Sequence, residues 1–312
     1  MRIAIIGRTE ILYKTAERLL ARGHSIGLIL TAKEAPEYIT TAHDFEHLAQ
    51  KINAPFIKTA RIDEATKAIK AMPAMDIAVS LNYSGVIPQS VIDCFRLGIL
   101  NAHGGDLPRY RGNACQAWAI LNGEDRVGLC IHSMVGGELD SGNIITRDYY
   151  PLTINTKVTE VWNWMSLRIP TLFDDSISAL DGDLNFRLMQ QSKNPKDALR
   201  CYPRRPEDGR IDWTKSAVDV LRLINACNKP YAGAFCKYNG DKLIIWDARL
   251  VDDHEIYMAV PGQVTRVGDE CIDVATAMGK LQINDVEFKG EVAKPSRFIR
   301  SIRNRLSRHN PL

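Results

Sequence analysis

The fold is decided by the first 31 residues of the chain, which read MRIAIIGRTEILYKTAERLLARGHSIGLILT. Met1 to Gly7 is an apolar run that favours a buried strand, and Ile11 to Arg22 carries apolar and small residues at helical spacing. Gly23 ends this helix, and Ser25 to Thr31 is a second apolar run. A strand, a helix and a strand of these lengths are typical of a right-handed βαβ unit, so the sequence predicts a parallel sheet.

The same alternation continues along the chain. Further strands are expected at 55–57, 76–81, 98–101, 127–134 and 143–150, and further helices at 42–52, 63–72, 114–121 and 158–180. We therefore expect an α/β fold with a Rossmann-like, mostly parallel sheet that carries helices on both faces.

The character of the sequence changes between Gln190 and Pro206, where the chain is polar and carries three prolines. We place a linker at 191–203, between a catalytic domain at 1–190 and a smaller domain at 204–312. After a helix at 216–226, short strands are expected at 234–238, 242–246, 262–267, 271–275 and 281–288, with Asn239-Gly240 as a strong hairpin signal. This pattern favours an OB-like β-barrel.

The barrel is followed by a basic tail, Lys289 to Leu312, which has seven Lys and Arg residues against one acidic residue, Glu291. Four apolar residues in it recur at helical spacing: Phe298, Ile299, Ile302 and Leu306. The spacing favours an amphipathic helix. We expect its apolar stripe to pack on its own domain rather than on a membrane or a nucleic acid.

Composition narrows the class of protein. The 312 residues are 45% hydrophobic and 25% charged with a net charge of +3, which is ordinary for a soluble globular protein and does not by itself indicate nucleic-acid binding. No apolar stretch is long enough to span a bilayer. The seven cysteines form no C-x-x-C pair, so we expect reduced thiols, a cytoplasmic location and no metal site.

Polar side chains follow one of the predicted strands. Asn101 and His103 end the apolar run that begins at Gly98, and their equal parity places them on one side of a strand. Asp140 opens a turn-prone Asp-Ser-Gly and can approach the same place from a loop. An amide can stabilise an oxyanion and an imidazole can move a proton. The carboxylate can orient the imidazole and favour its protonated form, or it can relay protons through water, so the three together suit acyl transfer.

The segment from Asn101 to Gly112, NAHGGDLPRYRG, followed by DSGNI from Asp140, resembles the folate-dependent formyltransferases. That family carries N-x-H, L-P-x-Y-R-G and D-x-G-x-I at this spacing. RRPEDGRIDW from Arg204 and PYAGAF from Pro230 are similar to the C-terminal domain of its methionyl-tRNA and UDP-amino-arabinose members. The resemblance implies formyl transfer from N10-formyltetrahydrofolate, with Asn101, His103 and Asp140 as catalytic residues. It also implies a folate site made of Leu81, Asn82, Tyr83, Gly85, Val86, Ile87, Gly137 and Glu138.

The acceptor amine is less constrained. The stretch from Thr31 to Glu46 holds one lysine against four acidic residues, which does not suit tRNA phosphates. The first turn is similar to that of sugar-nucleotide N-formyltransferases, which implies an amino sugar on a nucleoside diphosphate, destined for a surface glycan. The expected substrate contacts are Arg8, Thr9, Glu10, Arg111 and Asn113.

Two other readings stay open. The barrel and the basic tail favour methionyl-tRNA formyltransferase as the alternative enzyme, and a nucleic-acid-binding module with a degenerate first domain is the non-enzyme alternative. Thr9 also suits the N-cap of the first helix. Since dimers are common in the resembled family, we expect a homodimer, and we expect no nucleic-acid partner and no membrane insertion.

Overall fold

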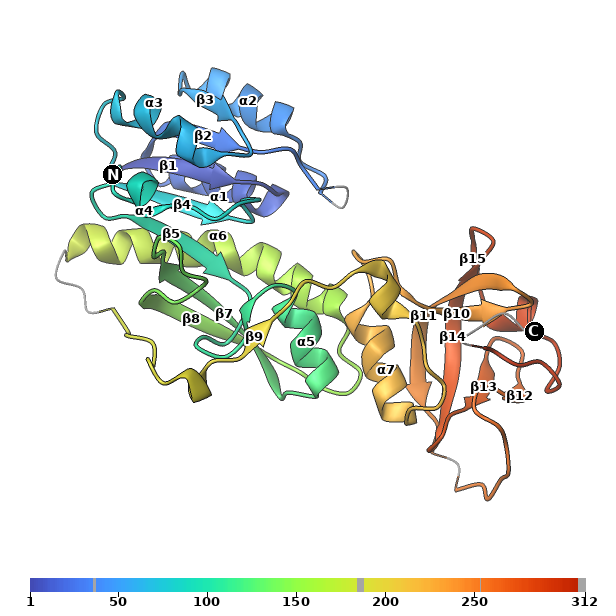
Figure 1. Cartoon of the computed structure of the whole chain (residues 1–312). Helices are drawn as coiled ribbons and strands as arrows, with labels where there is room; N and C mark the ends of the chain where they lie inside the picture. Colours follow the sequence, from blue (N-terminus) through green and yellow to red (C-terminus); the bar gives the residue numbers. More distant parts are fainter. Residues whose placement is uncertain (36–37, 184–187, 253, 308–312) are drawn as a thin grey trace. The chain divides into compact units, whose positions relative to one another are not determined.

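The computed structural model describes residues 1–35, 38–183, 188–252 and 254–307. The chain divides into two compact units (Figure 1). The first consists of Met1–Cys115, Gly128–Tyr150 and Asn163–Cys201, and the second of Gln116–Val127, Pro151–Trp162 and Tyr202–Leu312. The division of the sequence into 1–190, 191–203 and 204–312 stays a prediction.

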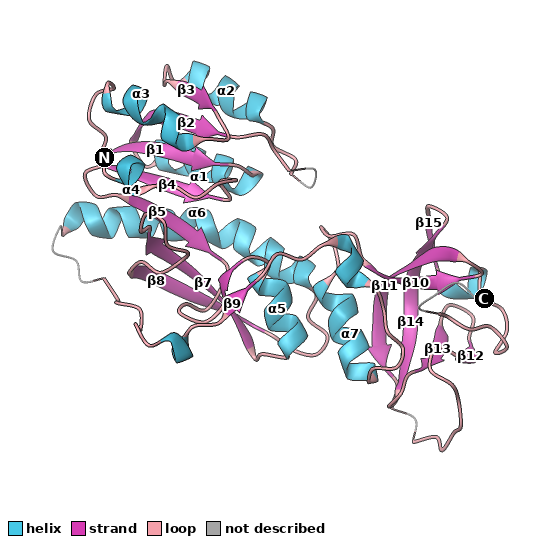
Figure 2. Ribbon diagram, in the orientation of Figure 1, coloured by secondary structure: helices cyan, strands magenta, loops and turns pink. Residues whose placement is uncertain are grey.

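The described residues from Met1 to Cys201 form nine strands and six α-helices, which alternate as far as β5 (Figure 2). The strands are β1 (Arg2–Gly7), β2 (Ser25–Thr31), β3 (Phe56–Lys58), β4 (Ile77–Leu81), β5 (Ile99–His103), β6 (Arg111–Gly112), β7 (Arg126–Ser133), β8 (Ile144–Pro151) and β9 (Arg200–Cys201). The helices are α1 (Glu10–Ala21), α2 (Ala42–Lys51), α3 (Thr66–Lys70), α4 (Gln89–Ile92), α5 (Cys115–Asn122) and α6 (Val158–Gly182), with 3-10 turns η1 (Ile62–Ala65) and η2 (Pro195–Asp197).

The main sheet has seven strands in the order β3-β2-β1-β4-β5-β7-β8. The first five are parallel, and β7 joins β5 in antiparallel orientation. The mostly parallel sheet expected from the sequence is therefore confirmed. The expected helix over 63–72 forms as η1 followed directly by α3.

Helices cover both faces of this sheet. Alternate strand residues such as Ala4 and Ile6 share a buried cluster with residues of η1, α3 and α4. On the other face, α1 is joined to α6 by the ion pair of Arg18 with the buried Asp174, and to α2 by edge-on contact of Tyr13 with Phe45. The strands are thus buried on both sides, as their continuous apolar runs require.

The strand order reverses direction between β1 and β4, whose carboxyl ends lie side by side. Arg8 donates its backbone N–H to the Leu81 carbonyl at 3.0 Å. Gly7 has a φ of +137°, and a Cβ there would lie 2.0 Å from the Leu81 oxygen, so only glycine allows this approach. In open α/β sheets ligands bind at such a reversal, outside the carboxyl ends of the strands.

The second unit is built on an antiparallel sheet. Its elements include η3 (Pro206–Gly209), α7 (Ala217–Ala226), β10 (Ala234–Tyr238), β11 (Asp241–Leu250), β12 (Val264–Val267), β13 (Ile272–Ala275), β14 (Lys280–Phe288), β15 (Glu291–Ala293) and η4 (Pro295–Arg297). The strand order is β10-β11-β14-β13-β12, with β15 beside β14. Asn239 and Gly240, both at positive φ, form the predicted turn between β10 and β11.

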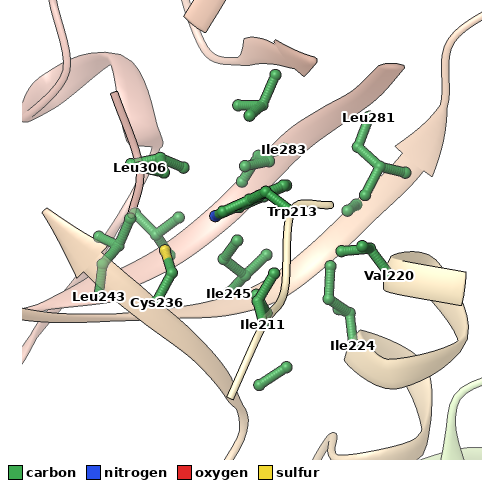
Figure 3. Close-up of a cluster of buried hydrophobic side chains, with 14 of the residues drawn as sticks. Ile211, Trp213, Val220, Ile224, Cys236, Leu243, Ile245, Leu281, Ile283 and Leu306 are labelled. Carbon is green, nitrogen blue, oxygen red and sulfur yellow. The ribbon is translucent and has the colours of Figure 1, made fainter. Parts of the chain in front are cut away.

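The core of this unit lies between the sheet and α7. Figure 3 shows the Trp213 ring among aliphatic side chains of the strands and of the tail, including Ile283 and Leu306. Trp213 is 3% exposed and Ile283 is fully buried. Burial of large apolar side chains of this kind stabilises the fold by roughly 1.5–3 kcal/mol for each residue.

The tail corrects one expectation. Its described part, to Ser307, forms β15, η4 and extended chain instead of an amphipathic helix. Leu306 and Ser307 donate backbone N–H groups to Gly262 and Lys237, so the tail bridges the open edges next to β12 and β10 and closes the barrel. The backbone groups at these sheet edges have no neighbouring strand among the described residues, and the extended tail supplies hydrogen-bond partners for them. Ile299 and Leu306 are buried in the core of their own unit, whereas Ile302 of the expected stripe is 56% exposed, so the expected packing holds for part of the stripe. Residues 308–312, and positions 36 and 37 of the acidic stretch, lie outside the described residues.

In the part of the chain that the structure describes, no helix combines the length and the apolar character needed to cross a bilayer, including the 25-residue α6.

Candidate active site

Strand β5 carries the two polar residues that the sequence singled out. It lies between β4, where Ser80 pairs with Asn101, and β7, where His132 pairs with Asn101. The Asn101 amide Nδ2 lies 3.2 Å from His132 Nε2. His103 is 7% exposed, whereas Asn101 is half-buried.

Asp140 reaches this strand end from the turn after β7. Its Oδ2 lies 3.5 Å from His103 Nδ1 and its Oδ1 lies 3.5 Å from His132 Nε2. The backbone N–H of Gly112 donates to Oδ2 at 2.9 Å. The turn approaches β7 so closely that a Cβ on Gly142 would lie 1.8 Å from the Ser133 carbonyl oxygen. The structure thus brings Asn101, His103 and Asp140 together around His132.

The hydrogen bonds fix where the protons of the two imidazoles lie. His103 Nε2 is 2.6 Å from the Tyr110 carbonyl oxygen, which can only accept, so Nε2 carries a proton and the lone pair of the neutral ring is on Nδ1. His132 Nδ1 likewise donates to the Ser133 carbonyl at 2.9 Å. While this ring is neutral, His132 Nε2 is left to accept from the Asn101 amide, which orients that amide.

The charges of the cluster are set by burial and by proximity. Burial lowers the pKa of His103 below its ordinary value, although the neighbouring Asp140 carboxylate opposes the shift. Burial alone would raise the pKa of Asp140, but the positive charges that His103 and His132 carry when they are protonated, together with the Gly112 N–H, outweigh it and hold this pKa at about 2. At neutral pH the site therefore holds a neutral His103 beside an ionised Asp140. This arrangement can accept a proton on Nδ1 and stabilise the resulting imidazolium.

Two residues of this site were missed in the sequence. His132 lies on β7, and it belongs to the site only because β7 pairs with β5 in the register that places His132 opposite Asn101. Gln191 was assigned to the linker, yet it is 9% exposed and its amide contacts the turn that holds Asp140. For His132, the only available signal was a histidine in a predicted strand just before the Asp140 turn.

The expected folate residues lie on two neighbouring segments. Leu81 and Ile87 are buried, whereas Val86 is 72% exposed. The second segment, which holds Gly137 and Glu138, is tied to the first because Gly136 donates its N–H to Gln89 Oε1 at 2.9 Å. The remaining members of the first segment, Asn82, Tyr83 and Gly85, are exposed or half-buried.

Exposed apolar side chains lie within three residues of Gly136 and of Gln89 in the sequence. Val135 and Leu139 are each 36% exposed, and Val86 is more exposed still. A Cβ on Gly137 would have nothing within 4 Å. Such an apolar, uncrowded surface beside the strand ends fits a flat ring system.

The expected substrate residues of the first turn are largely engaged within the protein. Arg8 donates to the Asn82 and Lys33 carbonyls, and Thr9 is fully buried with a φ of +94° and caps α1 through Leu12. Such strain in a β-branched residue is typical of functional sites. Glu10 is half-buried, and its Oε2 is buried without a hydrogen-bond partner among the described residues.

The other two expected substrate residues lie beside the cluster. Arg111 is the first residue of β6 and comes directly after Tyr110. The buried Nε of Arg111 has no hydrogen-bond partner in the described part of the chain. Asn113 is exposed two residues further on. Arg111 and Asn113 are therefore the two neighbours of Gly112, whose N–H donates to Asp140.

Two family descriptions match the chain. "Formyl transferase" matches residues 1–166, and "Formyl transferase, C-terminal domain" matches residues 204–303. Among curated proteins, the chain is 27% identical over 298 residues to methionyl-tRNA formyltransferase of Geotalea uraniireducens, which covers 93% of this chain and 91% of that enzyme. It is 26% identical over 303 residues to the enzyme of the same name from Geobacter sulfurreducens, covering 95% and 92%.

Solved structures with the same fold include WlaRD, a sugar 3N-formyl transferase solved in the presence of dTDP and 5-N-formyl-THF. Its TM-score is 0.68 at 18% identity, and the match covers 93% of this chain and 98% of that one. The N-formyltransferase of Helicobacter canadensis, in complex with folinic acid and dTDP-3-aminofucose, gives 0.65 at 17% identity, covering 91% and 99%. HypX from Aquifex aeolicus gives 0.64 at 18% identity, covering 95% of this chain and 46% of HypX.

Proposed function

This chain belongs to the formyl transferase family, and from that premise we propose that it transfers the formyl group of N10-formyltetrahydrofolate to the amine of a nucleoside-diphosphate-linked amino sugar. That it is a formyl-transfer enzyme follows from the family, whose two domains match most of the chain. The donor and the acceptor are the proposal. The observation that carries the proposed chemistry is the convergence of Asn101, His103 and Asp140.

In this proposal His103 is the general base. An amine attacks a carbonyl carbon only when it is neutral, so the ammonium proton of the acceptor has to leave. The lone pair of His103 is on Nδ1, because Nε2 donates to Tyr110. Protonation of Nδ1 produces an imidazolium 3.5 Å from the Asp140 carboxylate, which stabilises the new charge.

Asn101 is the proposed oxyanion donor. Its amide nitrogen carries two N–H groups, and one of them is directed at His132 Nε2. Held in this way, the amide can direct the second N–H at the oxygen that becomes negative when the formyl carbon is attacked. A preorganised donor of this kind typically contributes about two to three orders of magnitude in rate.

We place the folate against Leu81, Asn82, Tyr83, Gly85, Val86, Ile87, Gly137 and Glu138. The exposed apolar side chains beside the Gly136 contact support this placement, since a reduced pterin presents flat faces with polar edges. When bound, the donor supplies an activated formyl group. Arg8, Thr9, Glu10, Arg111 and Asn113 are then proposed to lie toward the acceptor.

The charge of the segment after β2 favours a nucleotide sugar as acceptor. Among its residues, Glu34 accepts the Ala42 N–H and Asp44 accepts the Thr41 N–H, so carboxylates occupy the start of α2. A polyanion as large as tRNA would be repelled there, whereas a single diphosphate needs only a local cation. Two proteins of the same fold are WlaRD, a sugar 3N-formyl transferase, and the N-formyltransferase of Helicobacter canadensis, which was solved in complex with dTDP-3-aminofucose.

Methionyl-tRNA formyltransferase is the second candidate. It is favoured by the curated relatives of that name, which match this chain over more than nine-tenths of both lengths. The C-terminal domain of this chain ends in a basic tail, which is the part best suited by charge to contact an RNA.

One experiment separates these candidates. The purified protein is incubated with N10-formyltetrahydrofolate and, in separate reactions, with UDP- and dTDP-linked amino sugars or with initiator methionyl-tRNA, while tetrahydrofolate release is followed. Release with a nucleotide sugar alone supports the proposal, and release with the tRNA alone replaces it by the second candidate. Silence with every acceptor would favour a binding module. The proposed homodimer is checked by sedimentation of the same preparation.

A further inference from the structure

The segment before β9 runs along both loops that form the active site. Met189 and Ile144 exchange backbone hydrogen bonds at 2.8 Å at the start of β8. Further on, the Leu199 carbonyl accepts the Arg111 N–H at 2.9 Å and the Cys201 carbonyl accepts the Asn113 N–H at 3.1 Å. The residues from 189 to 201 thus contact the chain on both sides of the cluster.

Gln191 is a side chain of this segment that contacts both loops of the site. Its Nε2 donates to the Asp140 carbonyl at 2.8 Å and to the Gly142 carbonyl at 2.7 Å. Its Oε1 accepts from Arg111 Nη2 at 2.7 Å. Both N–H groups and the oxygen of the amide are therefore engaged, and the residue is 9% exposed.

These contacts act on the backbone that carries the Asp140 carboxylate. Asp140 has a φ of +49°, in the left-handed region that residues other than Gly, Asn and Asp seldom adopt. Such a turn persists when neighbouring contacts hold it. The Gly112 N–H fixes one carboxylate oxygen, whereas Gln191 fixes the two carbonyls on either side of Ser141.

We infer that Gln191 is a positioning residue, which holds the Asp140 turn against His103 and links that turn to Arg111. The inference stands on these hydrogen bonds. Its kinetic consequence rests on the proposed function, because only a working enzyme shows it. If Arg111 contacts the acceptor, the same amide connects the acceptor to the acid that pairs with His103.

The test uses Gln191→Met, which preserves the length and volume of the side chain and removes all three hydrogen bonds. Gln190→Met is the matched control, because Gln190 is the exposed neighbour with the same chemistry. Gln191→Asn is the second variant. It keeps a polar amide at the buried position but withdraws it by one methylene, so it remains informative where the Met variant fails to fold.

The first readout needs no substrate. The imidazole of His103 is titrated by NMR in the wild type and in each variant. The charged and titratable groups around it are Asp140, His132, Arg111 and the Cys115 thiol. Asp140 raises the pKa of His103, so release of the turn is expected to lower the His103 pKa by at least about half a unit. A His103 pKa equal to that of the wild type in both Gln191 variants would overturn the inference.

The second readout is the formyl-transfer rate. Displacement of Asp140 by about 1 Å is expected to lower kcat of the Gln191 variants about 10²-fold with little change in the KM for the folate, while Gln190→Met stays at wild-type activity. Unchanged kcat in a variant whose His103 pKa has shifted would also overturn the positioning role. If no acceptor is formylated even by the wild type, the proposed function fails, and the titration still decides the role of Gln191.

Discussion

The Nδ1 atom of His103 lies 3.5 Å from Oδ2 of Asp140. The other nitrogen of the same ring, Nε2, donates to the Tyr110 carbonyl. The imidazole therefore has one nitrogen at which it can take up a proton, and a carboxylate stands beside that nitrogen. Because the side chains of His103 and Asp140 are 8% and 11% exposed, bulk water screens this pair weakly.

The pH dependence of the reaction follows from this pair. Burial lowers the pKa of His103, so the ring stays neutral down to a pH below its ordinary value of 6.5. As pH falls through the lowered pKa, the base becomes protonated and activity is lost. We expect the acid limb of kcat/KM to lie below pH 6.5. An acid limb clearly above that value would contradict the assignment of His103 as base.

Replacement of the base tests its chemical role. His103→Asn is expected to lower kcat by about 10²–10⁴-fold, the usual contribution of a general base. The melting temperature should change little, because Asn also donates a hydrogen bond. Exposed His47 on α2 provides the control, and His47→Asn should leave kcat unchanged. A large drop in melting temperature of His103→Asn would indicate that His103 mainly supports the fold.

Loss of the proposed oxyanion donor has a separate signature. Asn101→Ala is expected to lower kcat about 10²–10³-fold with nearly constant KM for both substrates, because the donor acts in the transition state. Asn155→Ala, at an exposed amide, is the matched control. Steady-state kinetics decide the point, and a change confined to KM would assign Asn101 to substrate binding instead.

The sequence was sufficient for the features that are encoded locally. The alternation of apolar runs and helical segments predicted the sheet. The equal parity of Asn101 and His103 predicted that their side chains lie on the same side of one strand. Asp140 was identified because its turn has a recognisable composition. These inferences need only the residues within a short segment and the geometry of a strand or a turn.

Features that depend on distant pairing were not predicted. His132 belongs to the site because β7 lies antiparallel to β5 with His132 opposite Asn101, and one sequence does not specify that register. Gln191 lies in a polar, proline-containing stretch that reads as a linker. The spacing of Ile299 and Leu306 favours a helix, yet the tail is extended there, because Leu306 and Ser307 form backbone hydrogen bonds with Gly262 and Lys237.

The acid stability of the protein depends on Asp140. Its pKa in the folded protein is held at about 2, below the ordinary value of 3.8. A depressed pKa contributes stability that is present above about pH 4 and lost as pH falls toward 2. The difference corresponds to about 2 kcal/mol.

Asp140→Asn tests this linkage. Urea unfolding of the wild type and of this variant between pH 7 and pH 2 should show a stability difference that shrinks by about that amount below pH 4. A difference independent of pH would mean that the carboxylate is not stabilised by its neighbours in the folded state.

The tail contributes to the core of the second unit through Leu306. Leu306 is 1% exposed and packs in the cluster around Trp213 (Figure 3). Its backbone N–H donates to the Gly262 carbonyl. Leu306→Ala should destabilise the protein by about 2–5 kcal/mol, because it leaves a cavity in this core. Ile302 lies in the same tail but is 56% exposed, so Ile302→Ala should change the free energy of unfolding by less than about 0.5 kcal/mol. Denaturant unfolding measures both, and equal effects of the two substitutions would show that the tail does not complete the core.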